Sequence, residues 1–270
     1  MSDGKYAFEK SKIIQGDCLE KMKLIPDGSI DMILADLPYG TTACKWDAII
    51  PLDKMWEQYN RVLSNDGCIV LTATNPFAAR LIMSNPKMFK YEWIWDKVSH
   101  SNPFVAKYRC LAVHEQILVF AKGKTKYNPQ MVKNNFKLKG DLPNGKHLGE
   151  LFINKNEGSK RNSSDFSNPK SIITIKRNGA FGKQKQKALH PTQKPVEIFE
   201  YLIKTYTDKG NVVLDNVAGS GTTGEACINL NRDFILIEKD PNYYEVIKKR
   251  VGEIFKNYGI DIQPLLNEQM

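Results

Sequence analysis

Residues 30–40 read Ile-Asp-Met-Ile-Leu-Ala-Asp-Leu-Pro-Tyr-Gly, and they give the clearest indication of the fold class. Its first six residues are mostly apolar, and a proline and a glycine follow shortly after them. A short apolar run that ends in such a turn is typical of a buried strand. Asp36 and Tyr39 then lie in the loop at the carboxyl end of the strand, where open α/β sheets bind ligands. Taken alone, the stretch also fits an ordinary turn with an acid and a half-buried ring.

A second stretch of the same kind lies near the C-terminus. An apolar strand ends in Asp215, the next turn carries Gly219 and Gly221, and a helical pattern leads to a second strand that ends in Glu238. In adenosine-binding βαβ units, glycines let the backbone approach the ligand and an acid after the second strand accepts the ribose hydroxyls. Asp215 and Glu238 are 23 positions apart, near the expected spacing of about 20. The alternative is a tight strand–helix turn with a surface glutamate.

The chemistry of the second turn favours one cofactor, S-adenosylmethionine. The turn is not a GxGxxG aimed at a pyrophosphate, and it has no Walker lysine, which argues against dinucleotides and ATP. Asp17, at another strand end, is a candidate for the adenine amino group, and Lys194 is a candidate for the cofactor carboxylate. Their plain alternatives are a helix cap and a solvated lysine. The predicted cofactor-binding residues are Asp17, Cys18, Lys194, Asp215, Gly219, Gly221, Thr222, Thr223 and Glu238.

Strand patterns alternate with helical patterns along the chain, which implies a largely parallel sheet in an α/β fold. The chain has 270 residues, enough for one large α/β domain with an insertion or for two domains. Strands are predicted at 12–16, 30–35, 68–72, 91–95, 116–120, 212–214 and 234–237. Helices are predicted at 19–24, 52–63, 77–83, 196–206, 222–230 and from 241 to about 255, with a turn at 65–67.

The positive charge of the chain is concentrated in one segment. The net charge is +9, but residues 122–189 hold sixteen Lys or Arg and four Asp or Glu, a net charge of +12, and the remainder has a net charge of −3. Such a segment favours an anionic polymer as partner, and the alternative is a solvated basic loop. Its residues are rich in Asn, Lys, Gly and Ser, which predicts a loop-rich insertion. The predicted DNA-binding residues are Arg161, Arg177, Lys183, Lys185 and Lys187.

Composition also excludes several classes of protein. The five cysteines are scattered without a CxxC pair and the four histidines have no metal-like spacing, which argues for free thiols and against zinc sites or disulfides. No apolar run is as long as a membrane span, and the N-terminus lacks the apolar core of a signal peptide. We therefore expect a cytoplasmic protein with no resident metal and no membrane partner.

Together these stretches resemble the amino-methylating DNA methyltransferases, in the motif order of their permuted beta subgroup. Asp36-Leu37-Pro38-Tyr39 looks like the Asp-Pro-Pro-Tyr catalytic motif of that family. The other stretches that carry the resemblance are 16–18 with 26–31, Asn102-Pro103, Arg109, His114-Glu115, 190–195 and 215–223. The similarity covers most of 12–121 and 190–255, while 122–189 match no pattern that we can name. The resemblance implies a circularly permuted, Rossmann-like methyltransferase fold with catalytic (1–121), target-recognition (122–189) and cofactor-binding (190–270) parts.

Each of the two motifs departs from the family pattern. Leu37 replaces the first proline of the catalytic motif; if the family uses the backbone carbonyl there, leucine still supplies one. Asn216 and Val217 stand where the family usually has Pro-Phe, which bears on cofactor affinity.

The resemblance implies a direct transfer of a methyl group to an exocyclic amine in DNA. The Asp36 carboxylate and the Leu37 carbonyl would accept hydrogen bonds from that amine and free its lone pair for in-line attack. The base must leave the duplex, and Tyr39, which follows Pro38, is the ring expected to stack on it. No Pro-Cys nucleophile motif is present, in agreement with a mechanism without a covalent protein intermediate.

Several alternatives remain open at the level of sequence. Adenine N6 is the expected target atom, because the family's cytosine-N4 enzymes usually have serine where this chain has Asp36. Cytosine N4 is the first alternative, and RNA or protein glutamine the next. A non-catalytic nucleic-acid-binding module is the alternative from a different class. The target sequence, the preference for single or double strands, and monomer or homodimer are not decided.

Overall fold

The computed structural model describes residues 8–40, 48–100, 103–133, 165–176 and 193–266. The chain divides into a large unit, Met1–Asn128 with Ser171–Met270, and a small one, Pro129–Lys170. In the small unit, β6 (Val132–Lys133) pairs with β7 (Phe166–Ser167) in an antiparallel ladder. The three-part domain division at 121 and 189 stays a prediction.

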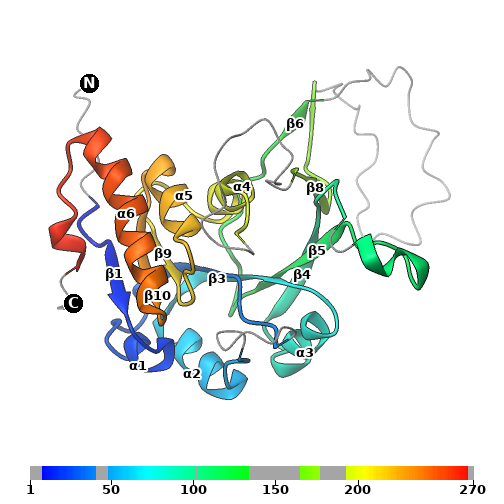
Figure 1. Ribbon diagram of the computed structural model, residues 1–270, viewed down its shortest axis with the longest axis horizontal. Helices are drawn as coiled ribbons and strands as arrows, with labels where there is room; N and C mark the ends of the chain where they lie inside the picture. The colour runs from blue at the N-terminus through cyan, green and yellow to red at the C-terminus, as the bar shows by residue number, and fades with distance from the viewer. Residues whose placement is uncertain (1–7, 41–47, 101–102, 134–164, 177–192, 267–270) are drawn as a thin grey trace, which may run out of the picture. The chain divides into compact units, whose positions relative to one another are not determined.

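The large unit is built on an eight-stranded sheet in the order β1-β10-β9-β2-β3-β5-β4-β8 (Figure 1). The first five strands in this order are parallel, whereas β5 runs antiparallel to both β3 and β4. The α/β fold with a mostly parallel sheet is therefore confirmed. The strands are β1 (Lys12–Gln15), β2 (Ile30–Ala35), β3 (Leu63–Ala73), β4 (Phe89–Asp96), β5 (His114–Phe120), β8 (Ile172–Thr174), β9 (Val212–Asp215) and β10 (Asp233–Glu238).

Helices cover both faces of this sheet, and the alternation of side chains along each strand explains why. On β2, Met32 and Leu34 pack in one apolar cluster and Ile33 and Ala35 in the other, all four fully buried. The first cluster includes α4 (Val196–Tyr206), α5 (Thr222–Leu230) and α6 (Pro241–Tyr258). The second includes α1 (Cys18–Met22), α2 (Leu52–Val62) and α3 (Phe77–Ser84), which Figure 1 shows on the other side. A strand with two buried faces is typically apolar along its whole length, and residues 30–35 are apolar except for Asp31.

β3 is longer than predicted and β8 is a strand that was not predicted, and pairing across the sheet explains both. β3 begins at Leu63, directly after α2, and the predicted turn at 65–67 lies inside it as an irregularity of the β2–β3 ladder. Residues Ile172–Thr174 form β8. This strand lies within the basic segment 122–189, yet it pairs with β4 and extends the main sheet. Two short 3₁₀ helices, η1 (Pro103–Lys107) and η2 (Gln263–Leu266), complete the described elements.

Candidate active site

One cavity of about 790 Å³ opens at the carboxyl ends of the parallel strands. Since β2 and β9 are neighbours, the loop after Ala35 and the loop after Asp215 meet there. The crossover from β9 leads to β10 and that from β2 leads to β3, in opposite directions along the sheet. The cavity therefore lies at the topological switch point, the usual ligand site of open α/β sheets.

The structure brings both predicted motifs into this cavity. All four predicted catalytic residues line it, and so do seven of the nine predicted cofactor residues; Gly221 and Thr223 do not. Thr223 is fully buried, and its hydroxyl donates to Oδ2 of Asp215. Gly221 has a φ of +77°, and a Cβ there would lie 3.2 Å from Ile247 on α6, so it shapes the turn.

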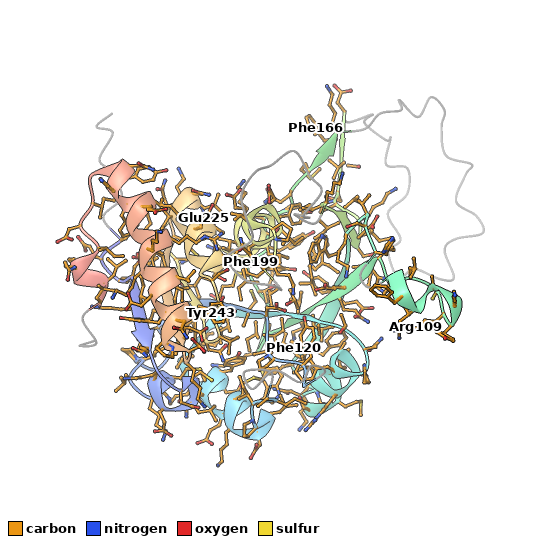
Figure 2. All side chains as sticks on the ribbon, viewed as in Figure 1. Arg109, Phe120, Phe166, Phe199, Glu225 and Tyr243 are labelled. Carbon is orange, nitrogen blue, oxygen red and sulfur yellow. The ribbon has the colours of Figure 1, made fainter. Side chains whose placement is uncertain are left out.

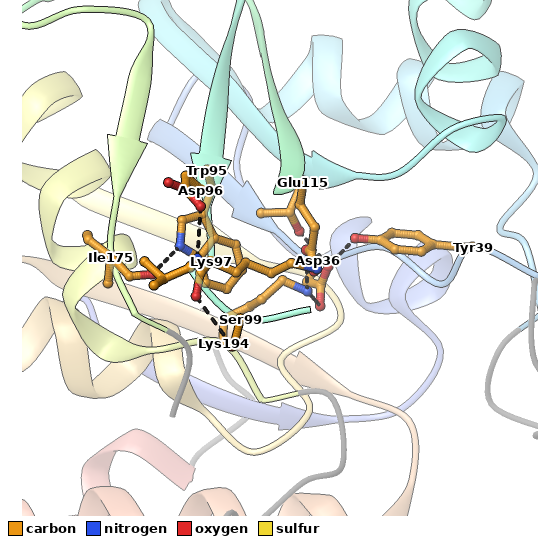
Figure 3. A network of polar contacts seen from close by, with 11 residues as sticks. Asp36, Tyr39, Trp95, Asp96, Lys97, Ser99, Glu115, Ile175 and Lys194 are labelled. Atoms are coloured by element: carbon orange, nitrogen blue, oxygen red, sulfur yellow. Dashed lines mark hydrogen bonds and ion pairs between the residues drawn. The ribbon is translucent and has the colours of Figure 1, made fainter. Parts of the chain in front are cut away.

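The Asp36 carboxylate is held by three side chains from three segments (Figure 3). The Tyr39 hydroxyl donates to Oδ1 at 2.7 Å, and the hydroxyl of Thr72, near the end of β3, donates to the same oxygen. Lys194 Nζ donates to Oδ2 at 2.6 Å. The carboxylate is thus fixed at the cavity wall while its side chain stays 25 % exposed.

Tyr39 acts in this arrangement as a neutral donor. Burial, followed by the neighbouring charge of Asp36, raises the pKa of Tyr39 well above its ordinary value. The ring packs against Phe77 at the start of α3, with 5.3 Å between ring centroids. Its predicted stacking on a flipped base stays a prediction.

Lys194 continues into a chain of alternating charges. Its Nζ lies 3.3 Å from Oε2 of Glu115, whose Oε1 accepts a hydrogen bond from Lys97 at 3.1 Å. Burial acts to lower the pKa of Lys194, but the charges of Asp36 and Glu115 outweigh it and the pKa is raised. Lys194 is therefore an ammonium in contact with Asp36, and its predicted contact with a cofactor carboxylate stays a prediction.

The acids of the cofactor half are also held by the backbone. Glu238 Oε2 accepts the Gly219 amide at 2.7 Å and Oε1 accepts the Asp240 amide at 2.8 Å. Burial raises the pKa of Glu238 above its ordinary value. Each carboxylate oxygen has two acceptor positions, so Glu238 retains capacity for the two hydroxyls of a ribose.

Asp17 is a helix cap that also lines the cavity, and its predicted contact with an adenine amino group stays a prediction. Its Oδ1 accepts the Leu19 amide at 3.0 Å as the N-cap of α1, and its Oδ2 lies 3.1 Å from Lys239 Nζ. Burial would raise the pKa of Asp17, but these partners outweigh burial and lower it. Asp17 also lines the cavity, so the cap presents a carboxylate to a bound ligand.

The cavity contains residues to which sequence reasoning gave no role. Trp95, Glu115, Phe199 and Tyr243 are among its lining residues; Figure 2 labels Phe199 on α4 and Tyr243 on α6. Asn216, noted only as a departure from the family pattern, is buried and accepts the Tyr59 hydroxyl through Oδ1 at 2.7 Å. These residues come from elements that are far apart in the sequence and meet only in the folded sheet. The periodicity of one sequence does not indicate such proximity.

Two buried polar atoms have no hydrogen-bond partner among the described residues, and both belong to cavity-lining side chains. They are Glu115 Oε2, an acceptor, and Asn216 Nδ2, a donor. An unsatisfied buried polar group costs about 1–3 kcal/mol. Glu115 Oε2 has the Lys194 ammonium at 3.3 Å, so the Asn216 amide is the donor that remains for a polar atom of a ligand.

The remaining predictions concern DNA-binding residues, metals, cysteines and membrane spans. Arg161, Arg177, Lys183, Lys185 and Lys187 lie outside the described residues. Within the described ranges, no group of three or more His, Cys, Asp or Glu is arranged to hold a metal ion, and four cysteines are free thiols. None of the helices in the described part of the chain is long and apolar enough to cross a membrane.

Comparison with known proteins gives the class. Residues 30–249 match the family model described as DNA methylase of the N6/N4 type. The chain belongs to this family of amino-methylating DNA methyltransferases, and S-adenosylmethionine is its cofactor.

Individual relatives support the same assignment. The chain is 30 % identical to the Type II methyltransferase M.HinfI of Haemophilus influenzae over 91 % of its own length and 69 % of the relative. It is 26 % identical to the DNA adenine methyltransferase YhdJ of Escherichia coli K12, over 95 % of this chain and 87 % of the relative.

Solved structures share the fold. The complex of M1.HpyAVI with S-adenosylmethionine aligns with a TM-score of 0.58 at 24 % identity, over 88 % of this chain and 98 % of that one. The cytosine-N4-specific PvuII DNA methyltransferase aligns with a TM-score of 0.62 at 16 % identity, over 94 % and 95 % of the two chains. This structural neighbour is named as cytosine-N4-specific, whereas a relative by sequence is named as an adenine methyltransferase, so the fold alone does not choose between adenine and cytosine.

The cavity suits the cofactor of the family. Glu238 and Asp17 offer acceptors at strand ends, Asn216 Nδ2 offers an unused donor, and aromatic rings line the wall. Bound S-adenosylmethionine supplies an electrophilic methyl group on a sulfonium.

The titration of Asp215 provides a first testable consequence. Burial, which the charges of Asp36 and Glu238 reinforce, raises its pKa from 3.8 to about 7. The native state then binds more protons than the unfolded state between about pH 4 and 7, so this residue's contribution to stability falls as pH rises through that window. We expect Asp215→Asn to gain stability relative to the native chain between pH 4.5 and 8. Urea unfolding of both proteins at several pH values measures the difference, and a difference that does not depend on pH would refute the assignment.

Proposed function

We propose that the chain is a site-specific DNA methyltransferase that transfers the methyl group to N6 of adenine. The observation that carries the proposal is the carboxylate of Asp36 at the wall of the shared cavity, fixed by Tyr39, Thr72 and Lys194. A carboxylate accepts a hydrogen bond more strongly than the hydroxyl of a serine. The similarity to a protein named as a DNA adenine methyltransferase supports the same choice.

The proposed mechanism uses the residues after β2. The lone pair of the adenine amine is delocalised into the ring, so the free base is a poor nucleophile. Hydrogen bonds from the amine to the Asp36 carboxylate and the Leu37 carbonyl favour a tetrahedral nitrogen whose lone pair points at the methyl group. Positioning and electrostatic stabilisation then lower the barrier. Asp36 is the nearest acceptor for the proton that leaves the methylated amine.

Leu37 suits this role although the family has proline there. Its side chain is 3 % exposed and packs in the apolar cluster beneath the catalytic loop. The side chain therefore anchors the loop, and the backbone carbonyl can serve the base. The adenine must leave the duplex to reach Asp36, with Tyr39 as the proposed stacking ring.

Residues 122–189 are proposed to hold the DNA. The motive is their net charge of +12 in a chain whose remainder has a net charge of −3. If about six of these charges meet phosphates, the logarithm of affinity falls against the logarithm of salt concentration with a slope of about −5. We expect simultaneous replacement of Lys183, Lys185 and Lys187 with Gln to reduce this slope by about 2 to 3 without a change in cofactor affinity. Fluorescence anisotropy across a salt series measures it, and an unchanged slope would assign the phosphate contacts to another surface.

Product identification tests the proposal. Unmethylated DNA is incubated with the protein and labelled S-adenosylmethionine, digested to nucleosides and analysed by mass spectrometry. We expect N6-methyldeoxyadenosine. N4-methyldeoxycytidine as the sole product would overturn the choice of target atom.

A further inference from the structure

Four charged side chains of alternating sign form a continuous row at the cavity wall (Figure 3). The row runs from Asp36 through Lys194 and Glu115 to Lys97, and its members come from the loop after β2, the segment before α4, β5 and the end of β4. The side chains of Lys97, Lys194 and Glu115 are 4 %, 8 % and 13 % exposed. Charges this well buried are costly to place, because each loses its hydration and only close partners compensate.

The state described here does not leave Asp36 ready for a substrate amine. Its Oδ1 accepts from both Tyr39 and Thr72, so its two acceptor positions are in use. Its Oδ2 is bound to the Lys194 ammonium at 2.6 Å. A cation at that distance draws charge from the carboxylate and weakens any further hydrogen bond that it accepts.

Glu115 offers the Lys194 ammonium a second place to bind. Its Oε1 is anchored by Lys97, whereas Oε2 lies 3.3 Å from Lys194 Nζ without the geometry of a hydrogen bond. Oε2 is also one of the two buried polar atoms without a hydrogen-bond partner in the described part of the chain. A movement of Nζ toward Oε2 shortens that contact and lengthens the contact with Oδ2 of Asp36, at constant net charge.

We propose that Glu115 is a positioning residue that receives the Lys194 ammonium when the target amine binds Asp36. Glu115 acts on the reaction through Lys194 and does not touch the base. Lys97 donates to Oε1 of Glu115 at 3.1 Å and so holds the carboxylate with Oε2 beside Lys194. An ammonium has three donors, so Lys194 keeps one N–H for another acceptor while it binds Glu115. This inference rests on the proposed role of Asp36, and it holds for an adenine or a cytosine amine.

The first test separates the rate of transfer from cofactor binding. Glu115→Gln keeps the size of the side chain but removes the charge that attracts Lys194. With enzyme in excess over target sites, we expect the first-order rate of total methyl incorporation into DNA to fall by about 20-fold. The dissociation constant of S-adenosylmethionine, measured by calorimetry, should change by less than about threefold, and Glu115→Asp should recover part of the rate. Asp233→Asn is the control, since Asp233 is a buried carboxylate that accepts from Ser11 outside the cavity.

The second test asks whether Glu115 acts through Lys194. If it does, Glu115→Gln costs about 20-fold in the native chain but less than about threefold in a Lys194→Met background, a coupling that a double-mutant cycle reports. Equal costs in both backgrounds, or a native rate for Glu115→Gln, would refute the proposal. Because the assay counts methyl groups on any base, a cytosine product would overturn the proposed target atom and leave this result intact. If Lys194→Met is too slow to measure, crystals of the native complex with DNA and an unreactive cofactor analogue decide, by whether Nζ lies closer to Glu115 Oε2 than to Asp36 Oδ2.

Discussion

Asp36→Asn is expected to lower methyl transfer to DNA by about 10³-fold or more while S-adenosylmethionine still binds. The amide keeps the size of the side chain but replaces one acceptor oxygen with an NH₂ group. That donor cannot accept a hydrogen bond from the substrate amine. It also loses the charge that holds Lys194 at 2.6 Å. Transfer of labelled methyl groups and calorimetric titration of the cofactor without DNA measure the two effects separately.

The control for Asp36 is a surface carboxylate outside the cavity, that of Asp27. Asp27→Asn removes the surface ion pair with Arg61, outside the cavity, and should leave transfer unchanged. If Asp36→Asn and Glu238→Gln caused the same loss of cofactor binding with DNA absent, the division of labour between base and cofactor would be wrong.

Glu238→Gln is expected to weaken S-adenosylmethionine binding by about 100-fold. The carboxylate offers charge-assisted hydrogen bonds to ribose hydroxyls, each worth about 1.5–3 kcal/mol. The amide also leaves one of the two backbone donors, Gly219 or Asp240, without its acceptor, which loosens the cofactor turn. Calorimetry on the purified variant gives the change in dissociation constant.

At saturating cofactor, the Glu238 variant should recover most of the transfer rate, because Glu238 lies away from the amine. Glu57→Gln, which removes an exposed ion pair with Lys54, is the matched control and should bind the cofactor normally. A Glu238→Gln protein with native affinity would show that another residue reads the ribose.

The elements that local pattern specifies were predicted well. The helices at 196–206 and 222–230 have the predicted ends, and they begin directly after Pro195 and Gly221, respectively. The strands that end at Ala35 and Asp215 were also predicted, since each is a mostly apolar run followed by a turn that contains Pro or Gly. Both loops proved to face one cavity, as the strand-end argument requires.

What the sequence did not reveal depends on pairing between distant segments. The antiparallel direction of β5 and the addition of β8 beside β4 are set by ladders that no local period encodes. The same holds for the row of charges. Lys194 was predicted as a contact of the cofactor, but its contacts with Asp36 and Glu115 join residues 158 and 79 positions apart.

We propose that Asp36 in this cavity directs methylation to N6 of adenine at a defined DNA sequence. The most direct measurement is made in a bacterial host that lacks its own adenine and cytosine methyltransferases and expresses either the native chain or Asp36→Asn. Genomic DNA from both strains is sequenced with detection of modified bases. The account predicts N6-methyladenine at one recurring sequence with the native chain and unmodified DNA with the variant. N4-methylcytosine at the recurring sequence, or the same modification in both strains, would contradict it.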